Sequence, residues 1–167
     1  MKKRSLREFK LALGNVDEAT RKAVHAPKAL TRLAWEDLDY LGWRDPGAQQ
    51  RGYLFIERNE RLHGVMVLNT KTQTSAGRAV MCAFCRMPRR FGQVVLFSSP
   101  TLTNPKGTST QGTYICADLD CNVRVNGLRP MSPLDPPADE LVGKHREQLA
   151  DSAQRFIASV LELPAAS

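Results

Sequence analysis

The chain has 167 residues, of which 42% are hydrophobic, 25% charged and 7% aromatic, and its formal net charge is +7. This composition excludes a wholly disordered chain, and the length suits one domain or one domain with a helical extension. We expect a cytoplasmic protein without a membrane partner, because no run approaches the roughly 20 apolar residues of a membrane-spanning helix and the charges of Arg7, Glu8 and Lys10 exclude a secretory signal.

Residues 1–34 are predicted to form a helical lead that precedes a domain over residues 35–167. Apolar side chains such as Phe9 and Leu13 recur in this lead near helical spacing. Pro27 interrupts the pattern because a proline ring cannot continue a helix, so we expect a joint there.

The segment 35–46, WEDLDYLGWRDP, is predicted to be short and helical. Its two tryptophans and two of its leucines recur near helical spacing, and a turn at 45–47 ends it. Large aromatic side chains chiefly supply buried area, so we expect Trp35 and Trp43 to be core anchors.

Five runs of β-branched and aromatic residues predict the strands of a small antiparallel sheet. The first two runs are joined by a polar turn at 58–61, which indicates a β-hairpin. Residues 98–112 are rich in Ser, Thr, Pro and Gly and are predicted to form a loop. The runs are 53–56, 64–68, 78–81, 93–97 and 113–115.

Residues 139–163 form the clearest predicted helix in the chain. Apolar side chains from Leu149 to Val160 recur at intervals of three and four, and Pro164 closes the pattern. The sequence therefore predicts an α+β fold, with short N-terminal helices and a long C-terminal packing helix.

Four cysteines occur as two spaced pairs, CAFC at Cys82 and Cys85 and CADLDC at Cys116 and Cys121. Disulfides are disfavoured in a reducing cytoplasm, and Zn²⁺ prefers four soft ligands in a tetrahedron. We predict one structural zinc ion bound by all four thiolates, with Asp118 capping a helix that carries the last ligand. Three alternatives remain: an iron site of rubredoxin type, a redox dithiol at CAFC, and free thiols.

No arrangement of residues in the sequence is typical of a catalytic site. His25, His63 and His145 are scattered, with neither metal-ligand nor catalytic-triad spacing. Four thiolates would saturate a zinc ion and leave no position for a reactive water molecule. We therefore expect a protein that is not an enzyme and has no small-molecule substrate.

The positive charge is concentrated between Arg61 and Ala117, where seven Lys and Arg occur without any Asp or Glu. Such a stretch indicates an acidic macromolecular partner, most often RNA, DNA or an acidic protein. The alternative is a surface that only keeps the protein soluble, because net charge constrains function weakly.

Three segments carry a resemblance to a known family: WEDLDYLGWRDP at 35–46, RAVMCAFC at 78–85 and GTYICADLDC at 112–121. Together they resemble the C-terminal treble-clef zinc-finger domain of the elongation factor G-binding proteins (FBP), over about residues 30–163. This group contains the fusidic-acid-resistance proteins, which carry a longer helical N-terminal domain. The resemblance implies a small sheet, a zinc knuckle at the first cysteine pair and a finger helix that starts near the second pair.

The resemblance also implies a function. Family members bind elongation factor G, largely through the finger, and promote release of that factor from the ribosome. In resistance members this release counteracts fusidic acid, which traps the factor there. Cys82, Cys85, Cys116 and Cys121 match the zinc-ligand positions of the family, although the ligands of the resistance proteins are not purely cysteine.

Residues beside the first cysteine pair are candidate contacts with elongation factor G, which is expected to be acidic. An exposed Phe84 ringed by arginines would suit a protein interface. In the other placement Phe84 packs inward and the arginines offset the cage, whose four thiolates and zinc sum to about −2. A zinc finger that binds RNA or the ribosome is the alternative function. The candidate contacts are Phe84, Arg86, Arg89, Arg90 and Phe91.

Overall fold

The computed structural model describes residues 1–69, 80–90, 92–101 and 110–164. Its helices are α1 (Leu6–Ala12), α2 (Glu18–Lys22), α3 (Cys121–Asn126) and α4 (Ala138–Leu161), with 3-10 helices at Lys28–Arg32 and Trp35–Asp37. Its strands are β1 (Leu41–Asp45), β2 (Ala48–Arg58), β3 (Arg61–Asn69), β4 (Val80–Met81), β5 (Pro88–Arg89), β6 (Val94–Pro100) and β7 (Thr110–Cys116).

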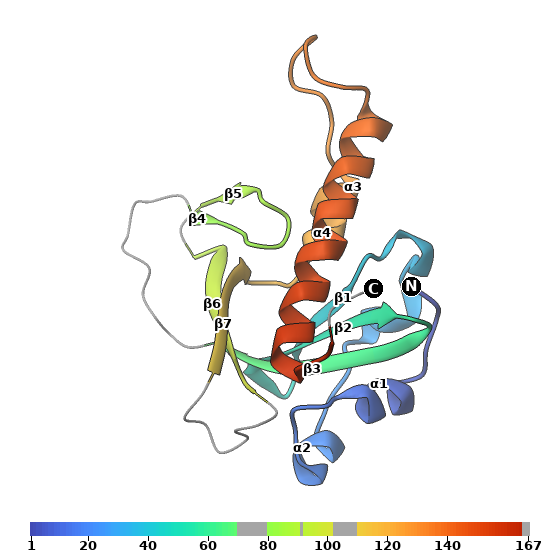
Figure 1. The fold of residues 1–167 in the computed structure, drawn as a ribbon, viewed down its shortest axis with the longest axis vertical. Helices are drawn as coiled ribbons and strands as arrows, with labels where there is room; N and C mark the ends of the chain where they lie inside the picture. The colour runs from blue at the N-terminus through green and yellow to red at the C-terminus, as the bar shows by residue number, and fades with distance from the viewer. Residues whose placement is uncertain (70–79, 91, 102–109, 165–167) are drawn as a thin grey trace.

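The strands form two antiparallel sheets (Figure 1). The larger sheet has five strands in the order β1-β2-β3-β6-β7, and the smaller sheet pairs β4 with β5. Helix α1 packs against β3 on one face of the larger sheet, whereas α4 crosses β2 and β3 on the other. The predicted α+β fold, with short N-terminal helices and a long C-terminal helix, is confirmed.

The N-terminal lead is helical in three short pieces, which are α1, α2 and the 3-10 helix Lys28–Arg32. Helix α1 begins at a capping box, in which the Ser5 hydroxyl accepts from the Glu8 N–H and the Glu8 carboxylate accepts from the Ser5 N–H. This box satisfies two N–H groups that a helix start leaves without partners. Pro27 lies directly before the 3-10 helix, at the expected joint.

The prediction of a helix over 35–46 is wrong. Only Trp35–Asp37 is helical, in a single 3-10 turn, and the chain then becomes strand β1. Leu41, Trp43 and Asp45 are buried alternately along β1, which is the two-residue period of a strand. Pairing with β2 and burial of Trp43 against the sheet therefore override the helical spacing of the apolar residues.

The hairpin predicted from its polar turn is present as β2 and β3. Arg58 pairs with Arg61, and the two residues between them, Asn59 and Glu60, have φ of 49° and 61°. Positive φ at both central positions gives the turn type whose twist matches the flanking strands. Strands β6 and β7 extend into the predicted loop 98–112, of which residues 102–109 lie outside the described residues.

Alternate side chains of β2 enter two separate cores, one on each face of the larger sheet. Tyr53 and Phe55 lie on the α1 face, in an aromatic core, and Leu54 and Ile56 lie on the α4 face, in a cysteine core. Trp35 and Trp43 are buried in the aromatic core, as core anchors should be. The aromatic core contains Phe9, Trp35, Trp43, Tyr53 and Phe55, and the cysteine core contains Cys82, Cys85, Cys116, Cys121, Leu54, Ile56, Leu149 and Ile157.

The long C-terminal helix α4 closes the cysteine core. Its buried side chains include Leu149, Ala153, Ile157 and Val160, spaced as the sequence predicts. The helix ends at Leu161, and the next residue, Glu162, adopts a left-handed conformation with φ of 53°. Within the described part of the chain, none of the helices has the length and apolarity to cross a membrane.

Candidate metal centre

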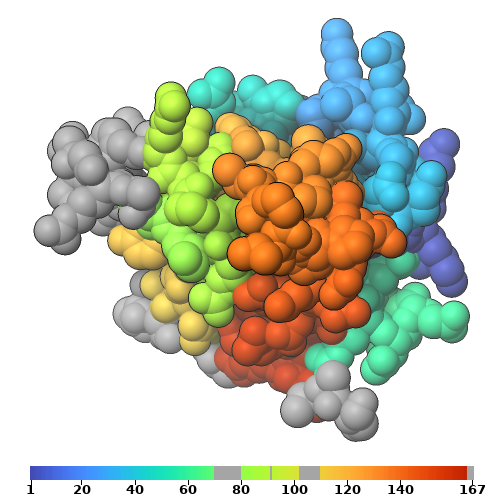
Figure 2. All heavy atoms as spheres, turned by 90° about the horizontal axis from the view of Figure 1, so that it is seen from above, coloured from blue at the N-terminus to red at the C-terminus, as the bar shows by residue number. Residues whose placement is uncertain are grey.

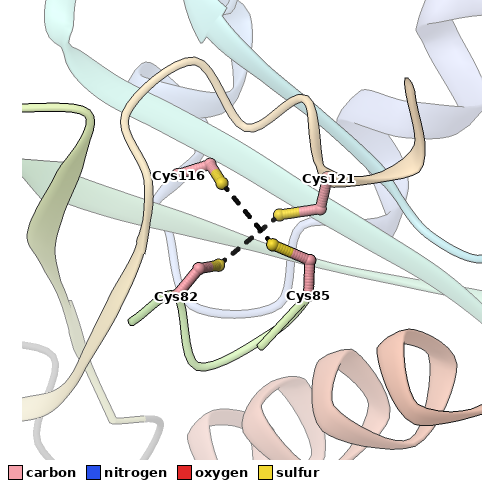
Figure 3. A group of neighbouring side chains, drawn as sticks. All are labelled: Cys82, Cys85, Cys116 and Cys121. Atoms are coloured by element: carbon pink, nitrogen blue, oxygen red, sulfur yellow. Dashed lines mark hydrogen bonds between the residues drawn. The ribbon is translucent and has the colours of Figure 1, made fainter. Parts of the chain in front are cut away.

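The four cysteine sulfurs converge at one buried point, although the two pairs are distant in sequence (Figure 3). All four Sγ atoms lie within 4.8 Å of one another, with 3.7 Å between Cys82 and Cys121 and 3.8 Å between Cys85 and Cys116. A tetrahedral zinc ion with Zn–S bonds of about 2.3 Å places its sulfurs about 3.8 Å apart. A disulfide would need about 2.05 Å, so the sulfurs form a cage of the size that zinc requires.

The first cysteine pair lies in the knuckle between β4 and β5. The Arg86 N–H donates to the Cys82 carbonyl at 2.9 Å, and the Cys82 N–H donates to the Met87 carbonyl at 3.1 Å. Arg86 adopts φ of 57°, which closes this tight turn after Cys85. The Ala83 N–H donates to the Tyr114 carbonyl at 2.7 Å and thereby fixes the knuckle to β7.

The second pair is held by Leu119, which lies between Cys116 and Cys121 with φ of 58°. Its N–H donates to the Cys116 carbonyl at 2.9 Å, and its side chain lies over two glycines of the sheet. A Cβ atom at Gly42 would lie 3.0 Å from the Leu119 Cβ, and one at Gly52 would lie 2.9 Å from its Cδ1. The four residues between these cysteines therefore allow the loop to pack Leu119 against the sheet, over Gly42 and Gly52.

Tyr40 and Asn122 join the 35–46 segment to this loop. The Tyr40 hydroxyl donates to the Leu119 carbonyl at 2.8 Å, and the Asn122 amide donates to the Tyr40 carbonyl at 2.7 Å. The Asn122 carbonyl in turn accepts from the Asp39 N–H at 2.9 Å. Burial raises the pKa of the Tyr40 hydroxyl far above its usual range, so it remains a donor. Sequence reasoning missed Asn122, whose only signal is its place next to a cysteine.

The order of these parts is that of a treble clef: a knuckle with two ligands, the hairpin of β6 and β7, and a helix that begins at the last ligand. The family model of the FBP C-terminal treble-clef zinc-finger matches residues 8–160. The chain belongs to this family. No curated protein and no solved structure matches it.

The donor set of this FBP zinc finger fits a structural zinc ion. Hydrogen bonds from the other thiols, that of Cys116 first, lower the pKa of Cys82, whereas hydrogen bonds with Cys116 and the other cysteines raise the pKa of Cys121. Without a metal, the pKa values of the cysteines thus shift in opposite directions. A zinc ion binds all four sulfurs as thiolates. Four sulfur ligands complete the tetrahedron, so the zinc stabilises the fold.

The placement of Phe84 corrects the expectation of an exposed aromatic anchor. Phe84 is 1% exposed, and its ring lies 5.5 Å from that of Tyr40 and 5.9 Å from that of Phe156. A ring that fills the space between the knuckle and α4 is more stable there than in water. Of the two placements that the sequence allowed, the inward one is correct. Phe91 lies outside the described residues.

The arginines of the FBP knuckle differ in exposure. Arg86 and Arg90 are exposed, whereas Arg89 is half-buried and donates from Nη1 to the Cys116 sulfur at 3.6 Å. Arg89 thus offsets the negative charge of the cage, and the other two arginines face solvent. Asp118 does not cap α3, because the helix starts only at Cys121 and Asp120 occupies the cap position. The Asp120 carboxylate accepts from the Arg124 guanidinium at 3.0 Å and makes no capping hydrogen bond.

Asp45 gives the LGWRDP motif of this family member a polar centre inside the aromatic core. Its carboxylate accepts from the Tyr53 hydroxyl at 2.8 Å, the Gly47 N–H at 2.8 Å and the His25 N–H at 3.1 Å. The Trp43 indole N–H donates to the His25 carbonyl at 3.0 Å. These hydrogen bonds therefore attach the chain around His25 to β1.

Proposed function

We propose that this FBP zinc finger binds elongation factor G in the cytoplasm and promotes release of that factor from the ribosome, an action that opposes fusidic acid. The proposed role is binding without catalysis, because four sulfur ligands leave zinc no position for a reactive water molecule. Membership of the FBP family supports the partner. One exposed surface supports the mode of binding.

The observation that carries the proposal is the loop 127–137, which projects beyond the start of α4 (Figure 1). Met131 and Leu134 are 98% and 95% exposed on this loop. The Asp135 carboxylate accepts from the N–H groups of Met131 at 2.8 Å and Ser132 at 2.9 Å. Apolar side chains on a loop held in this way lose little conformational entropy on binding and are typical anchors of a protein interface.

The β4–β5 segment (green), which carries the knuckle arginines, and this loop (orange) are both visible in the view from above (Figure 2). Arg86 and Arg90 supply the positive charge, and the loop supplies the apolar anchors. Cations around an apolar contact steer an acidic partner towards it and disfavour basic partners. An acidic surface of elongation factor G with an apolar pocket matches this combination.

The test is a calorimetric titration of the zinc-loaded chain with purified elongation factor G. The double variant Met131→Ser, Leu134→Ser should bind about tenfold more weakly or worse, because both anchors are lost. Leu11→Ser, which removes an exposed leucine from α1, is the matched control and should bind as the wild type does. A wild type that fails to bind would refute the function, and full affinity of the double variant would refute the surface.

Charge reversal tests the cations separately. Arg86→Glu with Arg90→Glu should weaken binding and reduce its dependence on salt while zinc content stays at one ion per chain. Lys28→Glu, in the 3-10 helix, is the control. Arg89 is left unchanged because it contacts a cysteine sulfur.

Release is measured by sedimentation of ribosomes that carry elongation factor G trapped by fusidic acid. The wild-type chain should lower the amount of factor that pellets, and the loop variant should not. The alternative of RNA binding predicts an affinity that falls by almost one log unit per phosphate contact for each log unit of salt. Capture of elongation factor G after nuclease treatment would count against that alternative.

A further inference from the structure

A second exposed apolar surface lies between α1 and α2, on the other side of the sheet from α4 (Figure 1). It is a groove of about 380 Å³ whose floor includes Leu6 and Leu11. Phe9 and Leu13 bury the inner side of this segment in the aromatic core, whereas Leu11 is 66% exposed. The exposed leucine therefore contributes little to the core.

Four cations and one carboxylate border the groove. Arg21 Nη1 lies 3.0 Å from the Glu18 carboxylate, and the Lys22 Nζ lies 3.8 Å from it, so the single acid is already paired. Among the described residues, no ion pair involves Arg7. The border thus keeps a net positive charge. The four cations are Arg7, Lys10, Arg21 and Lys22.

The two walls of the groove are joined by hydrogen bonds. The Lys10 ammonium, on α1, donates to the Lys22 carbonyl at the end of α2 at 2.8 Å. The Arg21 guanidinium, on α2, donates to the Leu13 carbonyl after α1 at 2.9 Å. These bonds hold the helices together, so the groove is formed before any partner arrives and binding need not order it.

We propose that this groove binds an acidic amphipathic helix of another protein, with apolar side chains against Leu6 and Leu11 and carboxylates against Arg7 and Lys22. The complementary charge of the border carries the choice of an acidic segment, and the apolar floor requires that the segment be amphipathic. RNA fits less well because none of the described residues that line the groove has an aromatic side chain for base stacking. The proposal does not depend on elongation factor G.

The probe is a fluorescent synthetic helix of about four turns, with Leu at intervals of three and four and Glu elsewhere. Titrated at physiological salt with the full zinc-loaded chain, it should bind saturably and shift amide resonances of α1 and α2. Leu11→Ser with Arg7→Glu should weaken binding by about tenfold. Val123→Ser, which removes an exposed apolar side chain from α3, is the control and should leave the affinity unchanged.

Four further probes decide the class of partner. A helix with Lys in place of Glu, and one with Ser in place of Leu, should both fail to bind. Poly(U) RNA and vesicles of anionic lipid should bind more weakly than the acidic helix, with no effect of Leu11→Ser. The proposal is overturned if the acidic helix does not bind, if the double variant binds it normally, or if RNA or vesicles bind more tightly at this groove.

Discussion

The two cores lie on opposite faces of one sheet, yet different interactions hold them. In the aromatic core, the Phe55 ring lies 4.9 Å from the rings of both Phe9 and Trp43. Phe55 belongs to the long strand β2, whose pairing with β3 supplies regular backbone hydrogen bonds. In the cysteine core, β4 and β5 have two residues each and α3 has six. Elements this short form few backbone hydrogen bonds, so other interactions must hold them together.

This difference indicates what zinc contributes. The knuckle, the Leu119 loop and α3 all meet at the four sulfurs, whereas none of the aromatic-core side chains reaches that point. Structural zinc contributes about 10–16 kcal/mol in small fingers, which is comparable to the total stability of a domain, about 5–15 kcal/mol. We therefore expect the two halves to respond differently to metal, packing and pH.

Loss of zinc should have the largest effect. Chelation, or Cys116→Ser, should unfold the knuckle and α3, because buried thiolates without a metal repel one another. Both tryptophans lie in the aromatic core, so their fluorescence should keep its buried emission while the circular dichroism of the helices falls. Metal analysis should give one zinc per chain before chelation. Simultaneous loss of both signals would show that the two halves unfold as one unit.

Truncation in the aromatic core should give the opposite pattern. Phe55→Ala removes a fully buried ring that touches two other aromatic rings, at a cost of about 3–5 kcal/mol. Denaturant unfolding followed by tryptophan fluorescence measures this loss. The purified variant should still bind one zinc, since the sulfurs lie in the other core. Loss of zinc below the unfolding midpoint would contradict this separation.

A pair of glycines tests the packing at smaller scale. A Cβ atom at Gly64 would lie 2.4 Å from the Phe55 ring, whereas one at Gly143, in α4, would meet nothing within 4 Å. Gly64→Ala should therefore cost about 1–3 kcal/mol through overpacking, and Gly143→Ala should stabilise the chain by about 0.5–1 kcal/mol through helix propensity. Thermal melting compares them. The two melting temperatures should shift in opposite directions, so shifts of the same sign would contradict the prediction.

Sequence patterns predict the elements whose period or turn chemistry is local. The hairpin follows from the polar turn between β2 and β3, and α4 follows from its apolar stripe. The helix prediction for 35–46 fails because the apolar residues of this segment fit helical spacing. The strand conformation of β1 comes from its pairing with β2, which no local sequence pattern indicates. Local spacing cannot show which of two periods the tertiary contacts select.

The candidate site divides in the same way. Cysteine spacing predicts that the four sulfurs lie close together, because a structural zinc ion needs four ligands in a tetrahedron. It does not predict the supports of the second pair, Leu119 and Asn122, which depend on contacts with Gly42 and Tyr40 from a distant segment. The inward position of Phe84 also depends on a ring of α4 that the sequence places 72 residues later, at Phe156.

Asp45 should make the stability of the aromatic core depend on pH. Burial raises the pKa of Asp45, but hydrogen bonds from the Tyr53 hydroxyl, the His25 N–H and the Gly47 N–H outweigh it, so the pKa is lowered overall. A carboxyl whose pKa is lowered on folding adds stability above its unfolded pKa of about 3.9. This stability is lost as the pH falls towards the folded pKa.

Comparison with Asp45→Asn isolates this contribution, because acid releases zinc from both proteins alike. At neutral pH the wild type should be more stable by about 1.5–3 kcal/mol, the range for hydrogen bonds to a charged group. Below about pH 4 the difference should shrink, since protonated Asp45 accepts these bonds less strongly. Guanidinium unfolding followed by tryptophan fluorescence measures both stabilities. If the difference in free energy of unfolding stays constant with pH, Asp45 acts through its shape and polarity, and its charge is irrelevant. The stability of the aromatic core would then not depend on the protonation of Asp45.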